Sequence, residues 1–279
     1  MRYEYSMDII TFHDLGKQGR LGNQLFQIAT TVATALRNNI VYAFPKWEYN
    51  KQLRTPIQSF VNDYEEKIKL SFDNIYREET FNYNEIDLSN LIKKDNTVNV
   101  ISLSGYFQSE KYFKDYRPSI IRLFAPSSEL HKEVINKYYS ISSQTYFAPT
   151  CSIHVRRTDY VDNQFYHPLD MEYYTDSIIK MIVDEQVANY IVFSDDIDWC
   201  KEHFAPLIHL FKDISIKFSE GNDELTDLML MKYCHHHIIA NSSFSWWGAW
   251  LCINPEKKVI FPPKWFGPAC NHDSKDLIF

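Results

Sequence analysis

Short apolar runs and amphipathic stretches follow one another at the beginning of the chain. A strand-like run at 7–12 leads into a loop with three glycines, and apolar residues then recur at helical spacing from Asn23 until two asparagines end the pattern. A second strand-like run at 40–44 is stopped by Pro45. This order of strand, glycine loop, helix and strand predicts a βαβ unit.

The rest of the first half is less regular. Residues 46–95 are charged and rich in Asn, Tyr and Glu, and we expect insertions and helices there. A strand-like run at 98–107 leads into a helical pattern at 109–124, where Pro118 should break or restart the helix because it lacks the backbone N–H. A further helix and a linker are expected in residues 126–148.

The second half alternates regularly between apolar runs and amphipathic stretches. The predicted strands are 151–155, 190–194, 237–242 and 257–262, and the predicted helices are 171–185, 195–207, 224–234 and 244–253. Such alternation is typical of a parallel sheet that is covered by helices on both faces. We therefore expect an α/β protein made of two doubly wound domains, residues 1–145 and 146–279.

Polar residues follow four of the predicted strands at equivalent places. In open parallel sheets, ligands bind at the carboxyl ends of the strands, where loops meet helix N-termini. Backbone donors, cations, carboxylates and hydroxyls are supplied in turn by GRLGNQ (19–24), RRTD (156–159), DDID (195–198) and SSFSWW (242–247). That combination suits a nucleotide diphosphate.

Two adjacent arginines, Arg156 and Arg157, end a strand that reads as buried. Successive strand side chains point to opposite faces, so we expect one guanidinium to reach an anionic ligand and its neighbour to brace the loop, for example against Asp159. Guanidinium groups make planar two-point contacts to phosphate and keep their charge near neutral pH. A purely structural Arg–Asp pair is an equally good interpretation of these residues taken alone.

The other polar loops are weaker signals. The glycines of GRLGNQ permit a tight turn before a helix N-terminus that favours anions, but an ordinary strand-to-helix turn has the same pattern. Asp195, Asp196 and Asp198 could hold a divalent cation or begin a helix. We assign Asp196 and Asp198 to the helix start, whereas Asp195 lies next to the strand end and could accept hydrogen bonds from a guanine.

Two conspicuous clusters are interpreted as structural. The consecutive histidines 235–237 lie on a predicted strand, so their side chains alternate in direction and cannot chelate one ion together. Trp246, Trp247 and Trp250 are expected to pack in the core, although one of them could border a sugar site.

Composition limits the kinds of partner. The 279 residues carry a net charge of −7, which excludes a general binder of nucleic acid, so a phosphate site must be local. Five widely spread cysteines without a CxxC pair favour reduced thiols in a cytosolic protein. The N-terminus carries acids, and no run approaches the about 20 apolar residues of a membrane span, so we expect neither a signal peptide nor a transmembrane segment.

Four stretches in this order resemble the family 11 alpha-1,2-fucosyltransferases, most strongly bacterial members without a membrane anchor: GRLGNQLFQIA, SGYFQSEKYF, HVRRTDY and IIANSSFSWWGAWL. The HxRRxD pattern is shared with alpha-1,6- and protein O-fucosyltransferases. The resemblance implies a GT-B fold of two Rossmann-like halves with the active site in the cleft between them. It also implies GDP-fucose as donor, inversion at the fucose anomeric carbon, and no required metal or other cofactor.

The resemblance further implies an acceptor-side first half and a donor-binding second half. His154 and Asp195 match positions that contact the guanine or the ribose. Arg156 matches the arginine on the β-phosphate, and Arg157 matches a residue that supports the loop.

The remaining matched positions complete the expected donor site. Gly22 and Asn23 would approach the pyrophosphate and the fucose, and the two serines before Phe244, with its backbone N–H, would donate to phosphate oxygens. The residues expected to bind the donor are Arg20, Gly22, Asn23, His154, Arg156, Arg157, Asp195, Ser242, Ser243 and Phe244.

A general base is not assigned by the resemblance. Related enzymes have an acid a few residues beyond HxRRxD, but Gln164 stands at that place here, so the assignment does not transfer. Asp159 and Asp162 remain the candidates, and with Arg156 they make up the expected catalytic residues.

The expected reaction moves L-fucose from GDP-fucose to the 2-hydroxyl of a terminal β-galactose on an oligosaccharide or lipid-linked acceptor, which residues 46–95 and 162–168 would shape. Three alternatives stay open: a metal-dependent glycosyltransferase that uses Asp-Ile-Asp, a nucleotide-binding module without transfer activity, and a protein O-fucosyltransferase. The lack of a secretory signal and of paired cysteines argues against the last. We expect a cytoplasmic enzyme that can lie at the inner face of a membrane.

Overall fold

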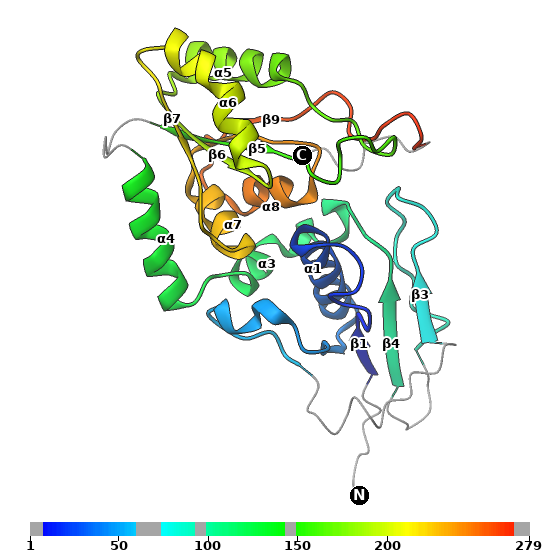
Figure 1. Ribbon diagram of the computed structural model, residues 1–279. Coiled ribbons are helices and arrows are strands. Elements are labelled where there is room, and N and C mark those ends of the chain that lie inside the picture. Colours follow the sequence, from blue (N-terminus) through cyan, green and yellow to red (C-terminus); the bar gives the residue numbers. More distant parts are fainter. Residues whose placement is uncertain (1–7, 60–73, 93–98, 143–148, 271–279) are drawn as a thin grey trace, which may run out of the picture. The chain divides into compact units, whose positions relative to one another are not determined.

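The chain forms two compact units in a computed structural model that describes residues 8–59, 74–92, 99–142 and 149–270 (Figure 1). Unit 1 comprises Met1–Ser127 with Lys275–Phe279, and unit 2 comprises Ser128–Ser274. The boundary therefore lies after Ser127, earlier than the expected boundary after residue 145. The reason is that helix α4 (Ser128–Ile141) packs on unit 2, where His131 Nδ1 lies 2.7 Å from the Tyr233 hydroxyl.

Unit 1 contains a parallel four-stranded sheet in the order β2-β1-β4-β3. Its strands are β1 (Asp8–Thr11), β2 (Val41–Tyr42), β3 (Ile75–Arg77) and β4 (Asn99–Ser104). Helix α1 (Leu21–Asn38) connects β1 to β2 and ends at Asn39, which adopts the left-handed conformation that closes a helix. The βαβ unit expected at the beginning of the chain is confirmed, with α1 beginning at Leu21, before the expected Asn23.

Two parts of unit 1 differ from the expectation. Strand β3 lies within 46–95, where no strand was predicted, because three residues are too few to show a period. The 3₁₀ helix η1 (Glu48–Gln52) also lies there, while 60–73 and 93–95 lie outside the described residues. The pattern at 109–124 is divided into η3 (Glu110–Tyr112), η4 (Lys114–Tyr116) and α3 (Arg117–Leu123). Pro118 restarts the helix because the first turn needs no N–H from it.

Unit 2 contains a parallel five-stranded sheet in the order β7-β6-β5-β8-β9. Its strands are β5 (Thr150–Val155), β6 (Asn189–Ser194), β7 (Ser215–Phe218), β8 (His236–Ile238) and β9 (Val259–Ile260). The edge strand β7 was not predicted, because only two apolar residues alternate in it. Strands β8 and β9 are shorter than the patterns at 237–242 and 257–262 suggested.

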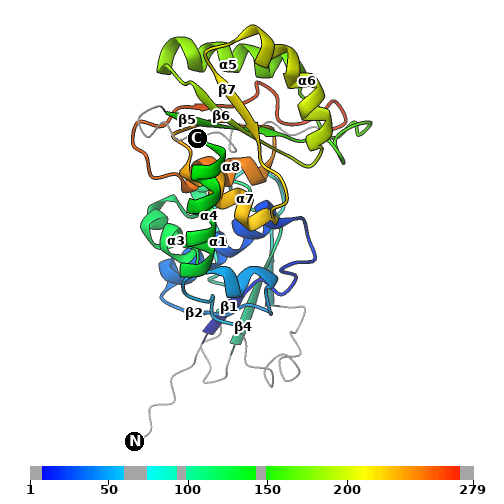
Figure 2. The ribbon, with the colours of Figure 1, turned by 60° about the vertical axis from the view of Figure 1, so that its left-hand side comes forward.

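Helices cover both faces of the unit 2 sheet. Helices α5 (Met171–Glu185) and α6 (Ile197–Leu210) lie on one face, and α7 (Glu224–Tyr233) and α8 (Ser243–Leu251) lie on the other, as both ribbon views show (Figure 2). The expected parallel sheet between two helical layers is therefore confirmed for this unit. Apolar residues of β5, β6, α5 and α6 make one continuous core.

The two conspicuous clusters are structural. Trp246, Trp247 and Trp250 are buried in α8, where Trp246 and Trp250 stack and Trp247 meets both rings edge-on, which confirms their expected place in the core. The rings of histidines 235–237 have three different partners: the first two accept from the backbone N–H groups of Thr150 and Lys258, and the third lies 2.8 Å from a serine hydroxyl. They do not converge on one point. Among the described helices, none has both the length and the apolar character of a membrane span.

Candidate functional site

The carboxyl ends of β5 and β6 lie side by side in unit 2. These strands pair in parallel, and their last residues, Val155 and Ser194, are register partners. The segments that follow, RRTD and DD, therefore begin at the same edge of the sheet. This pairing explains how residues 38 positions apart come into contact.

Arg156 is held between two carboxylates at this edge. Its guanidinium nitrogens lie 2.6 Å from Asp159 Oδ1 and 3.1 Å from Asp195 Oδ2. The guanidinium also lies 5.5 Å from the centre of the Tyr160 ring. The side chain is only 12% exposed, so the cation sits in a partly desolvated position between two carboxylates.

Arg157 points to the neighbouring helix. Its Nε donates to Asp196 Oδ2 over 3.1 Å, and its guanidinium stacks 3.8 Å from the Trp199 ring centre. Asp196 is the N-cap of α6 and accepts from the Trp199 backbone N–H, which confirms that it begins a helix. Asp198 lies in the first turn of α6 with its side chain 95% exposed, as expected of a helix-start acid.

The suggestion that Asp159 braces the second arginine is wrong. Asp159 pairs with Arg156, and Asp196 is the acid that pairs with Arg157. The two guanidinium groups have different partners, and the turn in which the Tyr160 N–H donates to the Arg157 carbonyl brings Asp159 to Arg156. Arg157 thus ties the loop to α6, whereas Arg156 stays at the open end of the strand pair.

Asp195 organises the loop that carries the arginines. Its Oδ1 accepts from the Arg157 backbone N–H over 3.0 Å, and its Oδ2 accepts from the Thr158 hydroxyl over 2.5 Å. Burial would raise the pKa of Asp195, but the hydrogen bond from Thr158 and the positive charge of Arg156 outweigh it and lower the pKa. Asp195 is therefore a carboxylate at neutral pH.

His154 lies beside the N-terminus of α8. The ring is 5.4 Å from the Phe244 ring, and its Nδ1 is a buried atom without a hydrogen-bond partner among the described residues. Burial, together with the charge of Arg156, lowers the pKa of His154 to about 3, so the imidazole is neutral. Ser242 caps α8 by accepting from the Phe244 N–H, and Ser243 is the first residue of that helix.

The loop after RRTD is fastened to the IIANSSFS segment. The Tyr160 and Tyr166 rings stack at 3.9 Å, and the Tyr160 hydroxyl donates to the carbonyl of Asn241. The Asn241 amide in turn donates to the His167 carbonyl. Asp162 lies in this loop in an exposed position with left-handed backbone (φ 67), and it does not share the contacts of Asp159 with Arg156.

The predicted residues of unit 1 form the first turn of α1. Arg20 is the N-cap residue without a side-chain cap, and Gly22 is buried in the turn. Asn23 is half-buried, and its side-chain oxygen accepts from Gln108 Nε2 over 2.6 Å. Gly19, just before the turn, has the positive φ of 78° that the tight turn requires.

Four partners of these residues were not identified from the sequence. In unit 2, Thr158 donates to Asp195, and Trp199 stacks on Arg157. In unit 1, Glu78 accepts from the Tyr106 N–H, and Gln108 donates to Asn23. A signal existed for Gln108, because it lies in SGYFQSEKYF, a motif to which no role was given. The others depend on contacts between distant segments, which spacing along the chain does not reveal.

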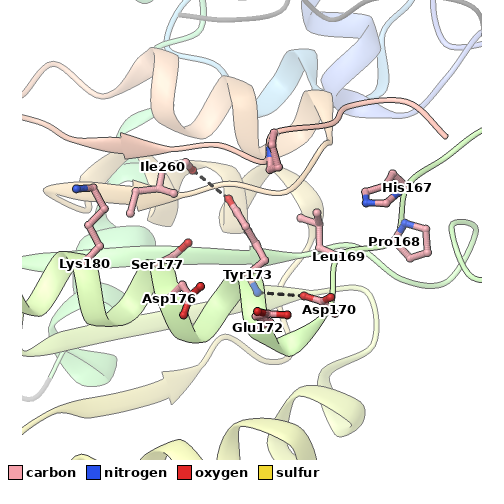
Figure 3. A pocket seen from close by; sticks show the side chains of 11 residues that line it. His167, Pro168, Leu169, Asp170, Glu172, Tyr173, Asp176, Ser177, Lys180 and Ile260 are labelled. Carbon is pink, nitrogen blue, oxygen red and sulfur yellow. Dashed lines mark hydrogen bonds between the residues drawn. The ribbon is translucent and has the colours of Figure 1, made fainter. Parts of the chain in front are cut away.

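A pocket of about 430 Å³ lies elsewhere in unit 2, between α5 and the segment that follows β9 (Figure 3). At its base the Tyr173 hydroxyl donates to the carbonyls of Ile239 and Ile260, and Asp170 caps α5. None of the predicted donor-binding residues lines it. The candidate site is therefore defined by the strand ends and not by this pocket.

Comparison with known proteins gives a family. The model of the family "Glycosyl transferase family 11" matches residues 2–268. Two Escherichia coli proteins are each 36% identical: an alpha-1,2-colitosyltransferase over 173 residues (60% of this chain, 56% of that protein) and the O-antigen biosynthesis glycosyltransferase WbnK over 181 residues (62% and 57%). The chain thus matches a little over half the length of each relative.

Solved structures agree on the fold. POFUT1 in complex with GDP has a TM-score of 0.55 at 13% identity and covers 92% of this chain and 98% of its own. An Arabidopsis thaliana FUT1 variant in complex with GDP has a TM-score of 0.57 at 12% identity, with 93% and 71% covered. Both are GT-B-type fucosyltransferases, so the GT-B-like α/β fold expected from the sequence is confirmed. With the family model matching nearly the whole chain, this protein belongs to glycosyl transferase family 11.

Proposed function

We propose that this glycosyltransferase moves L-fucose from GDP-fucose to the 2-hydroxyl of a terminal β-galactose, with inversion at the fucose anomeric carbon. Family membership supports a sugar transfer, and one relative is named for an alpha-1,2 linkage. Structural neighbours of the same fold bind GDP or GDP-fucose. The observation that carries the proposal is the position of Arg156, a partly buried cation at the carboxyl ends of β5 and β6.

Arg156 is the proposed partner of the β-phosphate. In the reaction the acceptor oxygen forms a bond to the anomeric carbon while the bond from that carbon to the phosphate oxygen breaks, and the electron pair leaves with GDP. Negative charge therefore grows on the β-phosphate in the transition state. A fixed cation aimed at that charge stabilises the transition state more than the ground state.

Ligand binding requires an exchange of partners at Arg156. Asp159 is 44% exposed and Asp195 is 17% exposed, so Asp159 is the partner that can move into water at the lower cost. Asp195 would stay in place, because it is also held by Thr158 and the Arg157 backbone. The diphosphate then takes the guanidinium face that Asp159 leaves, with the two-point geometry that guanidinium offers to phosphate.

Asp159 is the proposed general base. Once the diphosphate has displaced it, its carboxylate is a free proton acceptor close to the leaving group. Asp162 lies farther along an exposed turn without the contact to Arg156, and we rank it below Asp159. The 2-hydroxyl proton would pass to Asp159 as the new glycosidic bond forms.

His154 and the N-terminus of α8 are proposed to bind the rest of GDP. A neutral imidazole with an unpartnered, buried Nδ1 can bond to the guanine or ribose without adding a charge. The serine hydroxyls at the start of α8 can donate to phosphate oxygens, and the Phe244 N–H can do so once it leaves the Ser242 hydroxyl oxygen.

We propose that no metal is needed. The acids of the DDID segment already serve protein cations: Asp195 pairs with Arg156, and Asp196 pairs with Arg157 while it caps α6. Asp198 is 95% exposed and lies 3.8 Å from Lys201 Nζ. A metal-dependent transferase that uses Asp-Ile-Asp would have to break these pairs.

A second donor deserves testing because a relative is named a colitosyltransferase. Colitose is the 3-deoxy analogue of L-fucose, so a GDP ester of either sugar would release the same leaving group. We would incubate the protein with GDP-fucose or GDP-colitose and a panel of β-galactosides in EDTA, followed by mass and linkage analysis. We expect an alpha-1,2-fucosylated product.

Other products would point to other functions. Transfer of colitose but not of fucose would change the proposed donor and leave the proposed alpha-1,2 linkage unchanged. Transfer that appears only after Mn²⁺ is added would indicate the metal-dependent alternative. Tight GDP binding without a product on any galactoside would indicate a nucleotide-binding module.

A further inference from the structure

The pocket between α5 and the segment that follows β9 lies at the ligand-binding edge of the unit 2 sheet. Its volume of about 430 Å³ is in the range of small-molecule sites. Ile260, the last residue of β9, lines one side, and the first turns of α5 line the other (Figure 3). In parallel sheets, ligands bind where strands end and helices begin. The pocket therefore opens at the edge that also carries RRTD and DDID.

The wall of the pocket is joined to the loop that follows RRTD. This wall begins at His167, and the stack of Tyr160 on Tyr166, with ring centres 3.9 Å apart, brings the two ends of the loop together. The Asn241 amide donates to the His167 carbonyl over 2.9 Å, and the Asn241 carbonyl accepts from the Tyr160 hydroxyl over 2.8 Å. The pocket wall is thus fixed close to the segment that carries Asp159, the proposed general base.

One stripe of α5 presents polar groups to the pocket. Glu172, Asp176 and Lys180 all line it, and their spacing of four residues places them on one face of the helix. Neither carboxylate makes a hydrogen bond or an ion pair with any residue that the structure describes. Lys180 pairs with Asp184 over 2.7 Å, and its side chain is 66% exposed. The stripe therefore offers two hydrogen-bond acceptors followed by a donor.

The rest of the lining is mostly apolar. Pro168, Ile260 and Pro263 supply aliphatic surface, and the Tyr173 hydroxyl is already used in hydrogen bonds to main-chain carbonyls. A pyranose matches this combination, because its C–H groups are apolar and its hydroxyls both donate and accept. Two carboxylates beside one ammonium group disfavour a phosphate or an acidic sugar. The lining therefore suits a neutral sugar.

We propose that this pocket is an acceptor subsite: it binds a neutral sugar of the glycan that lies beyond the terminal galactose, while the galactose 2-hydroxyl meets Asp159. The inference rests on the proposed function for the identity of the acceptor. A glycan that is held in the pocket has a raised effective concentration of its galactose at the reaction centre. The pocket touches no reacting atom, so it should favour longer acceptors through KM and not through kcat.

A matched pair of acceptors tests the subsite. N-acetyllactosamine is the terminal disaccharide of lacto-N-neotetraose, so the two acceptors differ only in the inner lactose. We expect wild type to have a KM about tenfold lower for the tetrasaccharide, at similar kcat, because hydroxyl groups of the inner sugars bond to charged side chains. Equal KM values for the two acceptors would overturn the subsite.

A variant of the stripe on α5 assigns the effect to the pocket. Asp176→Ala removes one acceptor at an exposed helix position, so the fold should be kept. The KM for the tetrasaccharide should rise about tenfold, while the KM and kcat for the disaccharide stay unchanged. Glu202→Ala is the control, because it removes an exposed acid of α6 that does not line the pocket, and it should change neither KM. A KM that rises for both acceptors, or for neither, would overturn the assignment.

Binding without turnover separates this inference from the proposed function. Saturation-transfer NMR with lacto-N-neotetraose and no donor should show saturation of the inner lactose protons by wild type, and its loss in Asp176→Ala. If wild type transfers no sugar, the proposed function fails and this spectrum decides alone: the expected difference supports a sugar site in the pocket. Saturation that is absent, or that Asp176→Ala leaves unchanged, would overturn it.

Discussion

In unit 2 the carboxyl ends of β5 and β6 carry charged side chains, whereas in unit 1 the strands β1 and β4 are followed by glycines and carboxamides. Arg156, Asp159 and Asp195 form a cluster of one cation and two carboxylates. Asn23 and Gln108 form a neutral pair beside two glycine turns. The same architecture, a parallel sheet with loops at one edge, thus presents two kinds of chemistry.

The difference indicates a division of labour. A charge cluster can exchange an internal carboxylate for a diphosphate, which suits a group that leaves with negative charge. A fixed carboxamide offers a directed donor without charge, which suits hydroxyl and ring oxygens of a sugar. The predictions below are ordered by the expected size of their effect on this comparison.

Arg156→Ala should have the largest effect. Loss of a preorganised cation costs about 3–4 kcal/mol of transition-state stabilisation, so kcat should fall by about a hundredfold or more. Arg156→Lys should fail similarly, because an ammonium group cannot replace a planar fork. Initial rates at saturating donor measure the effect, with Arg122→Ala on the exposed side of α3 as the control. Near-normal turnover of Arg156→Ala would show that the charge cluster of unit 2 is not needed for transfer.

Gly19→Ala should have the next largest effect, and it tests the neutral Asn23–Gln108 pair of unit 1. Gly16 and Gly19 both have positive φ, at 85° and 78°, but a Cβ would meet nothing within 4 Å at Gly16 and Asn23 atoms at 2.3–2.9 Å at Gly19. Both alanine variants should lose about 1 kcal/mol of stability from backbone strain. Only Gly19→Ala should also lower kcat, by about tenfold, because it displaces Asn23. Equal rates in the two variants would show that the position of Asn23 does not matter.

Arg157→Ala should affect stability more than rate. It removes the stack on Trp199 and the pair with Asp196, which should lower the melting temperature by about 2–4 °C, while kcat falls by less than about tenfold. Thermal unfolding followed by circular dichroism measures the first effect. Lys201 lies on the same helix, α6. Lys201→Ala, which removes an exposed ion pair with Glu220, should change the melting temperature little. A rate loss as large as that of Arg156→Ala would contradict the separate roles of the two arginines.

Glu78 in unit 1 and Asp195 in unit 2 should contribute to the pH dependence of stability with opposite signs. The pKa of Glu78 is raised by burial, so the folded state binds its proton more tightly, and wild type should gain stability relative to Glu78→Gln as the pH falls through the raised folded pKa toward the ordinary carboxyl pKa. The pKa of Asp195 is lowered, so its contribution is present above the ordinary carboxyl pKa and is lost as the pH falls through the lower, folded value. Urea unfolding of Glu78→Gln and Asp195→Asn against wild type at several pH values measures both slopes. Slopes of the same sign would contradict these environments.

Much of the fold was predictable where the pattern is long or repeated. The run MEYYTDSIIKMIVDE predicted α5 at the residues where it lies, because fifteen residues give a clear helical period and Asp170 caps the start. Strands β3 and β7 were not predicted, because three or four residues at a sheet edge carry almost no period. The unit boundary was placed too late because the packing of α4 on α7 leaves no mark in the composition of the linker.

The candidate site was predictable as a set of loops but not as a set of contacts. The rule that parallel strands gather their following loops at one edge brought RRTD and DDID together. Which arginine pairs with Asp159 depends on how the chain turns after Thr158, and this is a property of the tertiary structure. The contact of Gln108 with Asn23 joins segments 85 positions apart, and no local pattern encodes it.

The central claim is that the Arg156 guanidinium, and not a metal ion, neutralises the leaving diphosphate. A crystal structure of the complex with GDP, grown with Mg²⁺ present, tests it most directly. We predict that Arg156 contacts the β-phosphate, that Asp159 has left the guanidinium, and that Asp195 still holds the loop. An Arg156 side chain that remains paired with Asp159, with a metal ion between the β-phosphate and the acids of DDID, would contradict the account.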